Sequence, residues 1–186
     1  SGRFAEELRK PPPEVITYFD EIGVRPAEGC RAEVNLAALD WMRGATQLLQ
    51  RGFVVTIDYG YEAEELYAPW RTDGTLLCFY RHNPSSDPYV RIGRQDMTSH
   101  IDFTSVRRAR EIAGLTTLGL VTQSEFLANL GIGEAIQPPE GGELEEYFAR
   151  RRAVTELLDP GGLGRIRVLI QAKDVGDIRL AGLRDA

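Results

Sequence analysis

The feature that most constrains the fold of this chain is an apolar run that begins after a glycine and ends in an acid. Residues 53–58 read Phe-Val-Val-Thr-Ile-Asp, and Gly52 stands directly before them. β-Branched and aromatic side chains with no polar alternation beyond Thr56 favour a strand that is buried on both faces. Such strands are typical of a parallel sheet with helices above and below, so the run predicts an α/β fold.

A helix is expected immediately before this strand. Over residues 33–49 the apolar side chains recur with a period near 3.6, the pattern of an amphipathic helix. Gly52 stands just after the last periodic residue, where a C-terminal cap belongs. Gly44 inside the helix costs about 1 kcal/mol relative to Ala, which favours close packing against a neighbour. Helix, glycine turn and strand together make one α/β unit.

The remaining elements are shorter and of both kinds. Helices or helical turns are expected before Pro11 and over residues 14–22, 62–68, 104–113, 124–130 and 143–158. Further strands are expected over residues 75–80, 116–122 and 166–172. Loops or turns are expected over residues 81–99, 138–142 and 159–162. The pattern predicts one α/β domain over residues 1–186, with residues 1–28 as a helical and loop lead-in.

Composition excludes several classes of function. The formal net charge of −6 provides no general basic face for nucleic-acid binding, and no apolar run reaches the roughly 18 residues of a membrane span. The two cysteines, Cys30 and Cys78, stand in no CxxC pair, so a reducing compartment is expected. The two histidines, His82 and His100, form no helical metal-binding pair, and no metal is expected.

The usual glycine-rich ligand motifs are missing from the chain. No GxGxxG, GxxxxGK[ST] or GxSxG pattern occurs. A strand like 53–58 normally serves a ligand at its carboxyl end, so the chain holds half of a ligand-binding apparatus. Because it also starts without Met and shows no signal peptide, we expect a fragment or a processed piece.

Three polar segments are candidates for a site. Asp58, Tyr59, Gly60 and Tyr61 follow the apolar strand, at the edge where open α/β sheets bind ligands. From spacing alone, an equally good interpretation is that Asp58 caps the next turn. Arg81 and His82 follow strand 75–80 and offer a cation and a base, although a surface loop explains them more simply. Residues 95–103 place small polar groups before a helix and could form a lid or a substrate wall, although capping by Asp102 or Thr104 is the simpler interpretation.

Several blocks of the chain resemble one family. Residues 56–61 (TIDYGY) resemble the IDYG signature of the MidA family of methyltransferases. Further blocks resemble that family in the same order, at residues 29–35, 74–82, 95–103, 122–127, 130–132, and 158–160 with Gly164 and the final strand. Together these matches span about residues 29–173, and several blocks in fixed order are more specific than any single motif.

The resemblance implies a class I, Rossmann-like methyltransferase sheet, with this chain as its C-terminal half. Residues 53–58 would be strand five and 116–122 strand six; strand seven, 166–172, would be antiparallel and inserted between them. S-adenosylmethionine is the implied cofactor. The family's mitochondrial member methylates an arginine of a complex I subunit, so a respiratory complex I-type protein substrate is implied here.

The resemblance also implies which residues form the site. The family's glycine-rich cofactor loop lies upstream, so the cofactor-binding residues are unknown and the isolated chain is expected to be inactive. Expected acceptor-side catalytic residues are Asp58, Tyr59, Gly60, Tyr61, His82, His100 and Asp102. Expected substrate-binding residues are Arg81, Gln95, Asp96 and Gln123. The protein is expected in the bacterial cytoplasm, or in the mitochondrial matrix if eukaryotic, and a homodimer is possible.

Two other interpretations stay open. The chain could be a noncatalytic binding or assembly module that lacks the cofactor loop. The chain could also be half of a nucleotide-binding oxidoreductase, because the missing GxGxxG does not exclude this class of protein. The family blocks favour it less.

Overall fold

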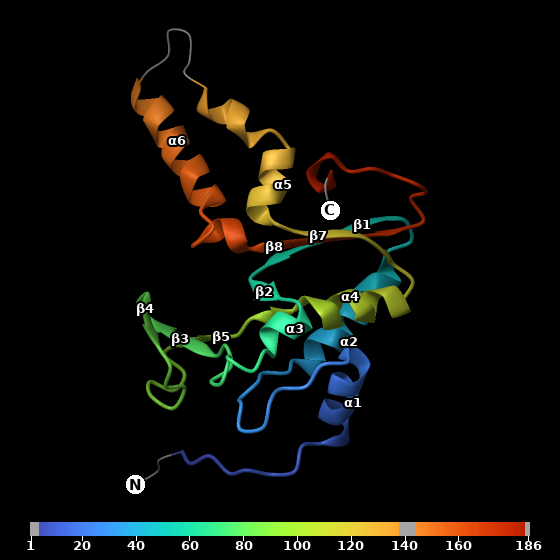
Figure 1. Ribbon diagram of the computed structural model, residues 1–186, viewed down its shortest axis with the longest axis vertical. Helices are drawn as coiled ribbons and strands as arrows, with labels where there is room; N and C mark the ends of the chain where they lie inside the picture. Colours follow the sequence, from blue (N-terminus) through green and yellow to red (C-terminus); the bar gives the residue numbers. More distant parts are fainter. Residues whose placement is uncertain (1–3, 138–143, 185–186) are drawn as a thin grey trace. The chain divides into compact units, whose positions relative to one another are not determined.

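The computed structural model describes residues 4–137 and 144–184, and the chain divides into two compact units (Figure 1). The first unit comprises Ser1–Met42 and Tyr61–Val106, and the second comprises Arg43–Gly60 and Arg107–Ala186. The single α/β domain expected from the sequence stays a prediction.

The first unit begins with an extended segment and a helix. Helix α1 spans Pro13–Ile22, with a proline in its first turn and Gly23 closing it in the left-handed conformation at φ 75°. The helix expected over residues 14–22 is therefore confirmed. The helical turn expected before Pro11 is wrong, since residues 4–10 form no helix. Lys10 directly precedes Pro11, and the residue before a proline is driven out of the helical region, so a helix could not run from this segment into the prolines.

The middle of the first unit is built from short elements. Helix α3 spans Ala63–Leu66, as expected. Strand β3 (Leu77–Tyr80) pairs antiparallel with β4 (Asn83–Ser85) on one side and β5 (Asp96–Thr98) on the other. The loop expected over residues 81–99 is therefore wrong in part, because backbone pairing there needs no apolar pattern. Short strands β2 (Gly60–Tyr61) and β6 (Ile101–Asp102) form a separate pair.

Two longer helices have residues in both units. Helix α2 spans Leu36–Leu48, and the Asn35 side chain accepts a hydrogen bond from the backbone N–H of Ala38 at its start. Helix α4 spans Phe103–Ile112. Two details expected near α2 are wrong. The helix ends before Gly52, which instead begins a strand, and a Cβ at Gly44 would meet no atom within 4 Å.

The second unit contains a three-stranded antiparallel sheet. Its strands are β1 (Gly52–Asp58), β8 (Arg167–Lys173) and β7 (Thr116–Thr122), in the order β1-β8-β7 (Figure 1). Strand β8 is antiparallel to both neighbours. The last strand therefore lies between the other two and runs against them, which is the position and direction that the family resemblance implied.

The expectation that strand β1 is buried on both faces is wrong within the described residues. Its burial alternates, and Phe53, Val55 and Ile57 on one face are 40%, 51% and 57% exposed. Within the described sheet β1 pairs on one side only, with β8. The apolar run therefore forms an edge strand with one covered face, and its pattern alone could not distinguish this from full burial.

The core of the second unit lies on one face of β7 and β8. Val121, Val168 and Ile170 are buried there. The core is covered by Leu118, Phe126, Leu180 and Leu183. Gly182 lies so close to the Phe126 ring that an added Cβ would come within 2.2 Å of it, so this contact requires glycine.

Short helices complete the second unit. Helix α5 (Gln123–Asn129) begins with a capping box between Thr122 and Glu125. Helix α6 spans Leu144–Leu158, and 3₁₀ turns span Ile132–Ile136, Leu163–Arg165 and Ala181–Leu183. These elements confirm the helices expected near 124–130 and 143–158. The loop expected over residues 138–142 lies outside the described residues. None of the described helices is long and apolar enough to span a bilayer.

Candidate functional site

The first unit encloses a small cavity of about 120 Å³. Its walls come from α1, α2, β6, α4 and the segments beside them, including Tyr67 directly after α3. The polar side chains in these walls include Tyr18, Glu33, Tyr67, His100, Asp102 and Ser105. Two carboxylates, two phenols and an imidazole therefore line one cavity. Of these five groups, only His100 and Asp102 were predicted from the sequence.

Asp102 is the most constrained of these groups. One carboxylate oxygen accepts hydrogen bonds from the backbone N–H groups of Thr104 (2.9 Å) and Ser105 (3.3 Å), so Asp102 caps α4. The other oxygen accepts a hydrogen bond from the Tyr18 hydroxyl at 2.5 Å. Asp102 is only 6% exposed, and this burial raises the pKa of its carboxyl group. The capping interpretation is therefore confirmed, and the same carboxylate also faces the cavity.

Two tyrosines extend the network away from Asp102. The hydroxyl oxygens of Tyr18 and Tyr67 lie 2.8 Å apart, and the Tyr67 hydroxyl lies 3.3 Å from the Glu33 carbonyl oxygen. Burial raises the pKa of both phenols, so both carry their protons at neutral pH. The arrangement that satisfies most groups has Tyr67 donating to Tyr18 and Tyr18 donating to Asp102. The phenols thus hold the buried carboxylate in place.

Glu33 and His100 are connected through Thr75. One Glu33 carboxylate oxygen accepts hydrogen bonds from the backbone N–H and the hydroxyl of Thr75, each at 2.8 Å. The Thr75 hydroxyl oxygen in turn accepts the backbone N–H of His100 at 3.0 Å. Gly74 adopts φ 71°, and a Cβ there would come within 2.3 Å of the Glu33 carboxylate. Glycine is therefore required for this close approach.

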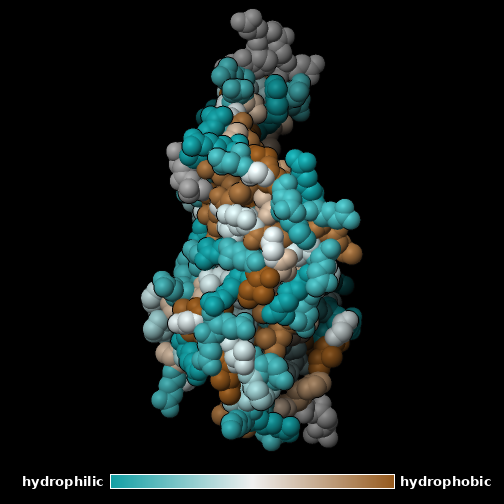
Figure 2. All heavy atoms as spheres, turned by 90° about the vertical axis from the view of Figure 1, so that its right-hand side faces the viewer, coloured by the Kyte–Doolittle hydropathy of each residue, from teal (hydrophilic) through white to brown (hydrophobic). Residues whose placement is uncertain are grey.

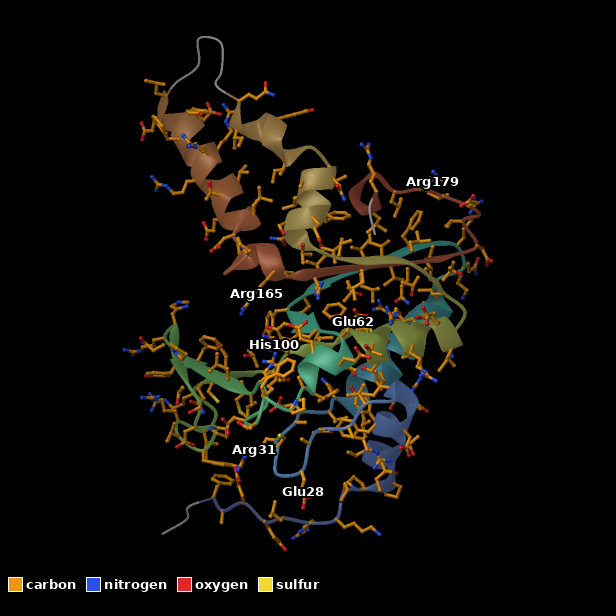
Figure 3. The ribbon with its side chains drawn as sticks, viewed as in Figure 1. Glu28, Arg31, Glu62, His100, Arg165 and Arg179 are labelled. Carbon is orange, nitrogen blue, oxygen red and sulfur yellow. The ribbon has the colours of Figure 1, made fainter. Side chains whose placement is uncertain are left out.

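An open groove of about 1,010 Å³ lies next to the cavity in the first unit and shares Glu33 and His100 with it. The ring of Tyr61 contacts the His100 imidazole edge-on at 5.1 Å between centroids. The Arg71 guanidinium, another lining group of the groove, lies 4.7 Å from the centroid of the Tyr61 ring. His100, labelled in Figure 3, is thus held between a tyrosine ring and the backbone contact from Thr75.

The structure brings three of the predicted catalytic residues together in the first unit. Tyr61 contacts His100, and His100 and Asp102 line the same cavity. Asp58, Tyr59 and Gly60 belong to the second unit. There the Asp58 carboxylate accepts the backbone N–H of the adjacent Tyr59 at 2.8 Å. The next helix, α3, has Glu62 at its N-cap position, so capping by Asp58 stays a prediction. The catalytic roles of all six residues stay predictions.

Other predicted residues lie in turns or structural contacts. Arg81 and His82 are exposed at the β3–β4 turn, with φ values of 51° and 64°. Asp96 is exposed on β5, and the Gln95 amide donates to the Asp87 carbonyl at 3.2 Å. In the second unit the Gln123 amide donates to the carbonyls of Leu157 and Leu163. Their proposed catalytic and substrate-binding roles stay predictions too.

Sequence reasoning missed Tyr18, Glu33, Tyr67, Arg71 and Thr75. Tyr18 stands on the buried side of α1, and Tyr67 follows α3 directly. A buried tyrosine hydroxyl needs a hydrogen-bond partner, so tyrosines within apolar stretches were the available signal. Within the described part of the chain, no three His, Cys, Asp or Glu side chains gather in a way that could hold a metal ion.

These features describe a mixed α/β protein whose first unit carries an acid- and tyrosine-lined cavity beside an open groove. A family model described as "Putative S-adenosyl-L-methionine-dependent methyltransferase" matches residues 1–121. The chain belongs to this family, whose cofactor is S-adenosylmethionine. No curated protein matches the chain.

Two solved structures, both of one superfamily from Burkholderia thailandensis, are similar to this chain. One is a native crystal structure of an uncharacterised member, with 29% identity and a TM-score of 0.85, covering 95% of this chain and 47% of the other. The second is a "likely methyl transferase" bound to S-adenosyl-homocysteine, also with 29% identity and a TM-score of 0.85, covering 98% and 46%. The chain thus spans about half the length of the structures that it matches.

The described cavity does not fit S-adenosylmethionine. Its volume of about 120 Å³ lies well below the roughly 300–1,000 Å³ of pockets that enclose small ligands. The larger groove is open and lined by charged side chains of both signs. The side chains of the Tyr18–Asp102 cavity therefore bind one another and leave no room for the cofactor.

Proposed function

We propose that this protein transfers a methyl group from S-adenosylmethionine to a protein side chain, and that this chain supplies the acceptor side. The carrying observation is the family match over residues 1–121. It is supported by the likeness to a protein that was crystallised with S-adenosyl-homocysteine, the product of methyl donation. We expect the cofactor to be bound by residues outside this chain.

The sheet of the second unit supports a class I methyltransferase fold. In our proposal β1, β7 and β8 are strands five, six and seven of that fold, with β8 inserted antiparallel between the other two. The exposed face formed by Phe53, Val55 and Ile57 is then covered by the remainder of the protein. An apolar face of this kind on an edge strand favours such a cover.

The acceptor-side chemistry rests on positioning. Methyl transfer needs the acceptor nitrogen held in line with the donor at close range, and carboxylates hold and orient a guanidinium or amine acceptor. Asp102 is already held by Tyr18 and by the start of α4, so it acts as a positioning residue for the segment that carries His100. His100, Glu33 and Tyr61 then face the acceptor from this segment and the groove.

The finer assignment follows the resemblance to the MidA family. We propose an arginine acceptor on a respiratory complex I-type subunit. Asp58, in the second unit, is a separate candidate for an acid that orients the guanidinium. The support is the set of family blocks together with the acidic groups of the first unit. The assay is methylation of candidate quinone-oxidoreductase subunits by the full-length protein, with labelled S-adenosylmethionine and mass spectrometry of the product. Label on lysine, or on no protein, would contradict the arginine assignment.

Asp102→Asn gives the sharpest test of the site. Asparagine can still cap α4 through its carbonyl oxygen but removes the charge that Tyr18 binds. We expect methyl transfer to fall by about 100-fold with the fold retained. Asp177→Asn is the matched control, because this acid is exposed and has no proposed role in catalysis or binding, and it should leave the rate unchanged. Asp58→Asn with full activity would remove Asp58 from the proposal.

A second candidate is a noncatalytic binding or assembly module. The small size of the enclosed cavity favours it, since no cofactor fits there. The two candidates separate by cofactor binding to the full-length protein. Calorimetry with S-adenosylmethionine should show specific binding if the protein is an enzyme and none if it is only a module. For the isolated chain we expect no tight binding in either case.

A further inference from the structure

Helix α6 of the second unit carries an open groove of about 940 Å³, the α6 groove. Elsewhere on the helix Val154 is buried, and α6 contacts α5 and the 3₁₀ turns at Ile132–Ile136 and Leu163–Arg165 (Figure 1). The groove is lined only by α6 and the turn that follows it, and its lining includes Phe148, Arg151, Arg152, Glu156, Leu158 and Pro160. Phe148 is 54% exposed, so a large aromatic ring stands largely uncovered in this lining.

The charges of the α6 groove are placed unfavourably for the helix itself. Glu156 stands in the last turn, near the negative end of the helix dipole, and no basic residue stands in that turn. Arg152 precedes Glu156 by four residues, which is the less favourable order for an ion pair within a helix. Within residues 4–137 and 144–184, no ion pair joins Arg151, Arg152 or Glu156 to another side chain. The charges of these exposed side chains are therefore available to a partner.

The order of the lining residues makes the α6 groove complementary to itself. Arg152 and Glu156 stand symmetrically about position 154, and so do Phe148 and Pro160. A second α6 that lies antiparallel across the groove, with a two-fold axis at that level, brings Arg152 opposite Glu156 of the second copy. The same axis brings Phe148 against the apolar end of the groove at Leu158 and Pro160 of the second copy. One symmetry operation therefore satisfies the charged and the apolar lining together, and each contact occurs twice.

We propose that the α6 groove is the interface of a symmetric homodimer in which the α6 helices of two copies lie antiparallel. The occupant is a second copy because the same groove supplies both the cations and the anions that the contact needs. Thr155, next to the axis, needs no polar partner from outside, since its hydroxyl donates to the Arg151 carbonyl at 2.9 Å. The helices meet over at most about four turns, so the interface is small and the dimer is weak and sensitive to salt.

The test is charge reversal in the full-length protein, followed by sedimentation velocity over a concentration series. Arg152→Glu alone and Glu156→Arg alone should each weaken self-association at least about tenfold, because each variant places like charges opposite one another. An equal mixture of the two variants should associate like the unchanged protein, because one copy then carries acids at both positions and the other carries arginines. A change within a single chain cannot produce this recovery, so the mixture tests the pairing between copies directly.

Two further variants separate the interface from folding. Arg150→Glu is the matched control, because it makes the same charge change on α6 at an exposed position outside the groove lining, and it should leave association unchanged. Phe148→Ser should weaken association at least about tenfold, while far-ultraviolet circular dichroism shows that the helix content is retained. An unchanged protein that stays monomeric would overturn the proposal. So would single variants that associate like the unchanged protein, or a mixture that stays as weakly associated as its two components.

Discussion

Strands β8 and β1 are hydrogen-bonded neighbours with similarly apolar sequences, yet their side chains are buried to different extents. From Val168 to Ala172, β8 is buried on both faces. In β1, the side chains of Phe53, Val55 and Ile57 remain substantially exposed. The two strands are paired residue by residue, Ile57 with Val168 and Val55 with Ile170. The difference therefore arises from what covers each strand and not from its sequence pattern.

The covering elements explain the contrast. On one face, Phe126 from α5 with Leu180 and Leu183 cover the sheet at β7 and β8. On the other face, Gln171 of β8 donates to the Arg107 carbonyl of α4, and Thr56 of β1 accepts from Arg110 of the same helix. Both strands are covered on this second face, whereas the first cover reaches β8 and leaves β1 open. Figure 2 shows that apolar side chains do reach the surface of the molecule among polar ones.

The largest expected effect is at the centre of β8. Leu169 is completely buried, so Leu169→Ala should lower the free energy of unfolding by about 2–5 kcal/mol through lost contacts and a cavity. Ile57→Ala on the open face of β1 should cost less than about 1 kcal/mol. Urea unfolding of both variants measures the contrast. Equal losses would mean that β1 is covered in solution as fully as β8.

A smaller loss is expected from the buried amide of β8. The Gln171 amide donates to the Arg107 carbonyl and the Thr117 hydroxyl, each at 3.1 Å. Gln171→Leu leaves both acceptors without this donor in a buried place and should cost about 1–3 kcal/mol. Thr116→Val, at an exposed position of the neighbouring strand, is the control and should change stability little. A neutral result for Gln171→Leu would show that water replaces the amide.

Thr56 tests the covered face of β1. Its hydroxyl accepts a hydrogen bond from the Arg110 guanidinium at 2.6 Å. Thr56→Val keeps the shape and removes this acceptor, so we expect a loss of about 1 kcal/mol. The measurement is again urea unfolding, with Thr56→Ser as the variant that retains the hydroxyl. If serine and valine lose the same amount, packing of the methyl group matters and the hydrogen bond does not.

Substitutions on the open face of β1 should have the smallest effect on the free energy of unfolding and the largest effect on self-association. Val55→Thr with Ile57→Thr keeps β-branched side chains, so the free energy of unfolding should change by no more than about 0.5 kcal/mol. Self-association of the chain should decrease, because the exposed apolar face and strand edge are what invite it. Sedimentation velocity across a concentration series measures this. Unchanged association would place the contact on another surface.

Part of the candidate site could be predicted from the sequence. Asp102 and His100 stand in a compact polar block before a helix, and the capping role of Asp102 follows from its position alone. Tyr18 and Tyr67, which hold that carboxylate, stand 84 and 35 residues before it by the sequence numbering. No local pattern joins positions so far apart, so these partners required the tertiary structure.

The sequence by itself determined the elements and their order: the strands at residues 53–58, 116–122 and 166–172, the main helices, and the family blocks. Periodicity, capping residues and glycine positions are patterns within a few consecutive residues, so they can be identified from the sequence alone. Only the tertiary structure decided that β8 is covered twice and β1 once, that residues 81–99 form strands, and that Glu6 reaches Arg31. These outcomes depend on contacts between distant segments, since burial is a property of the neighbours that a side chain meets and not of the side chain itself.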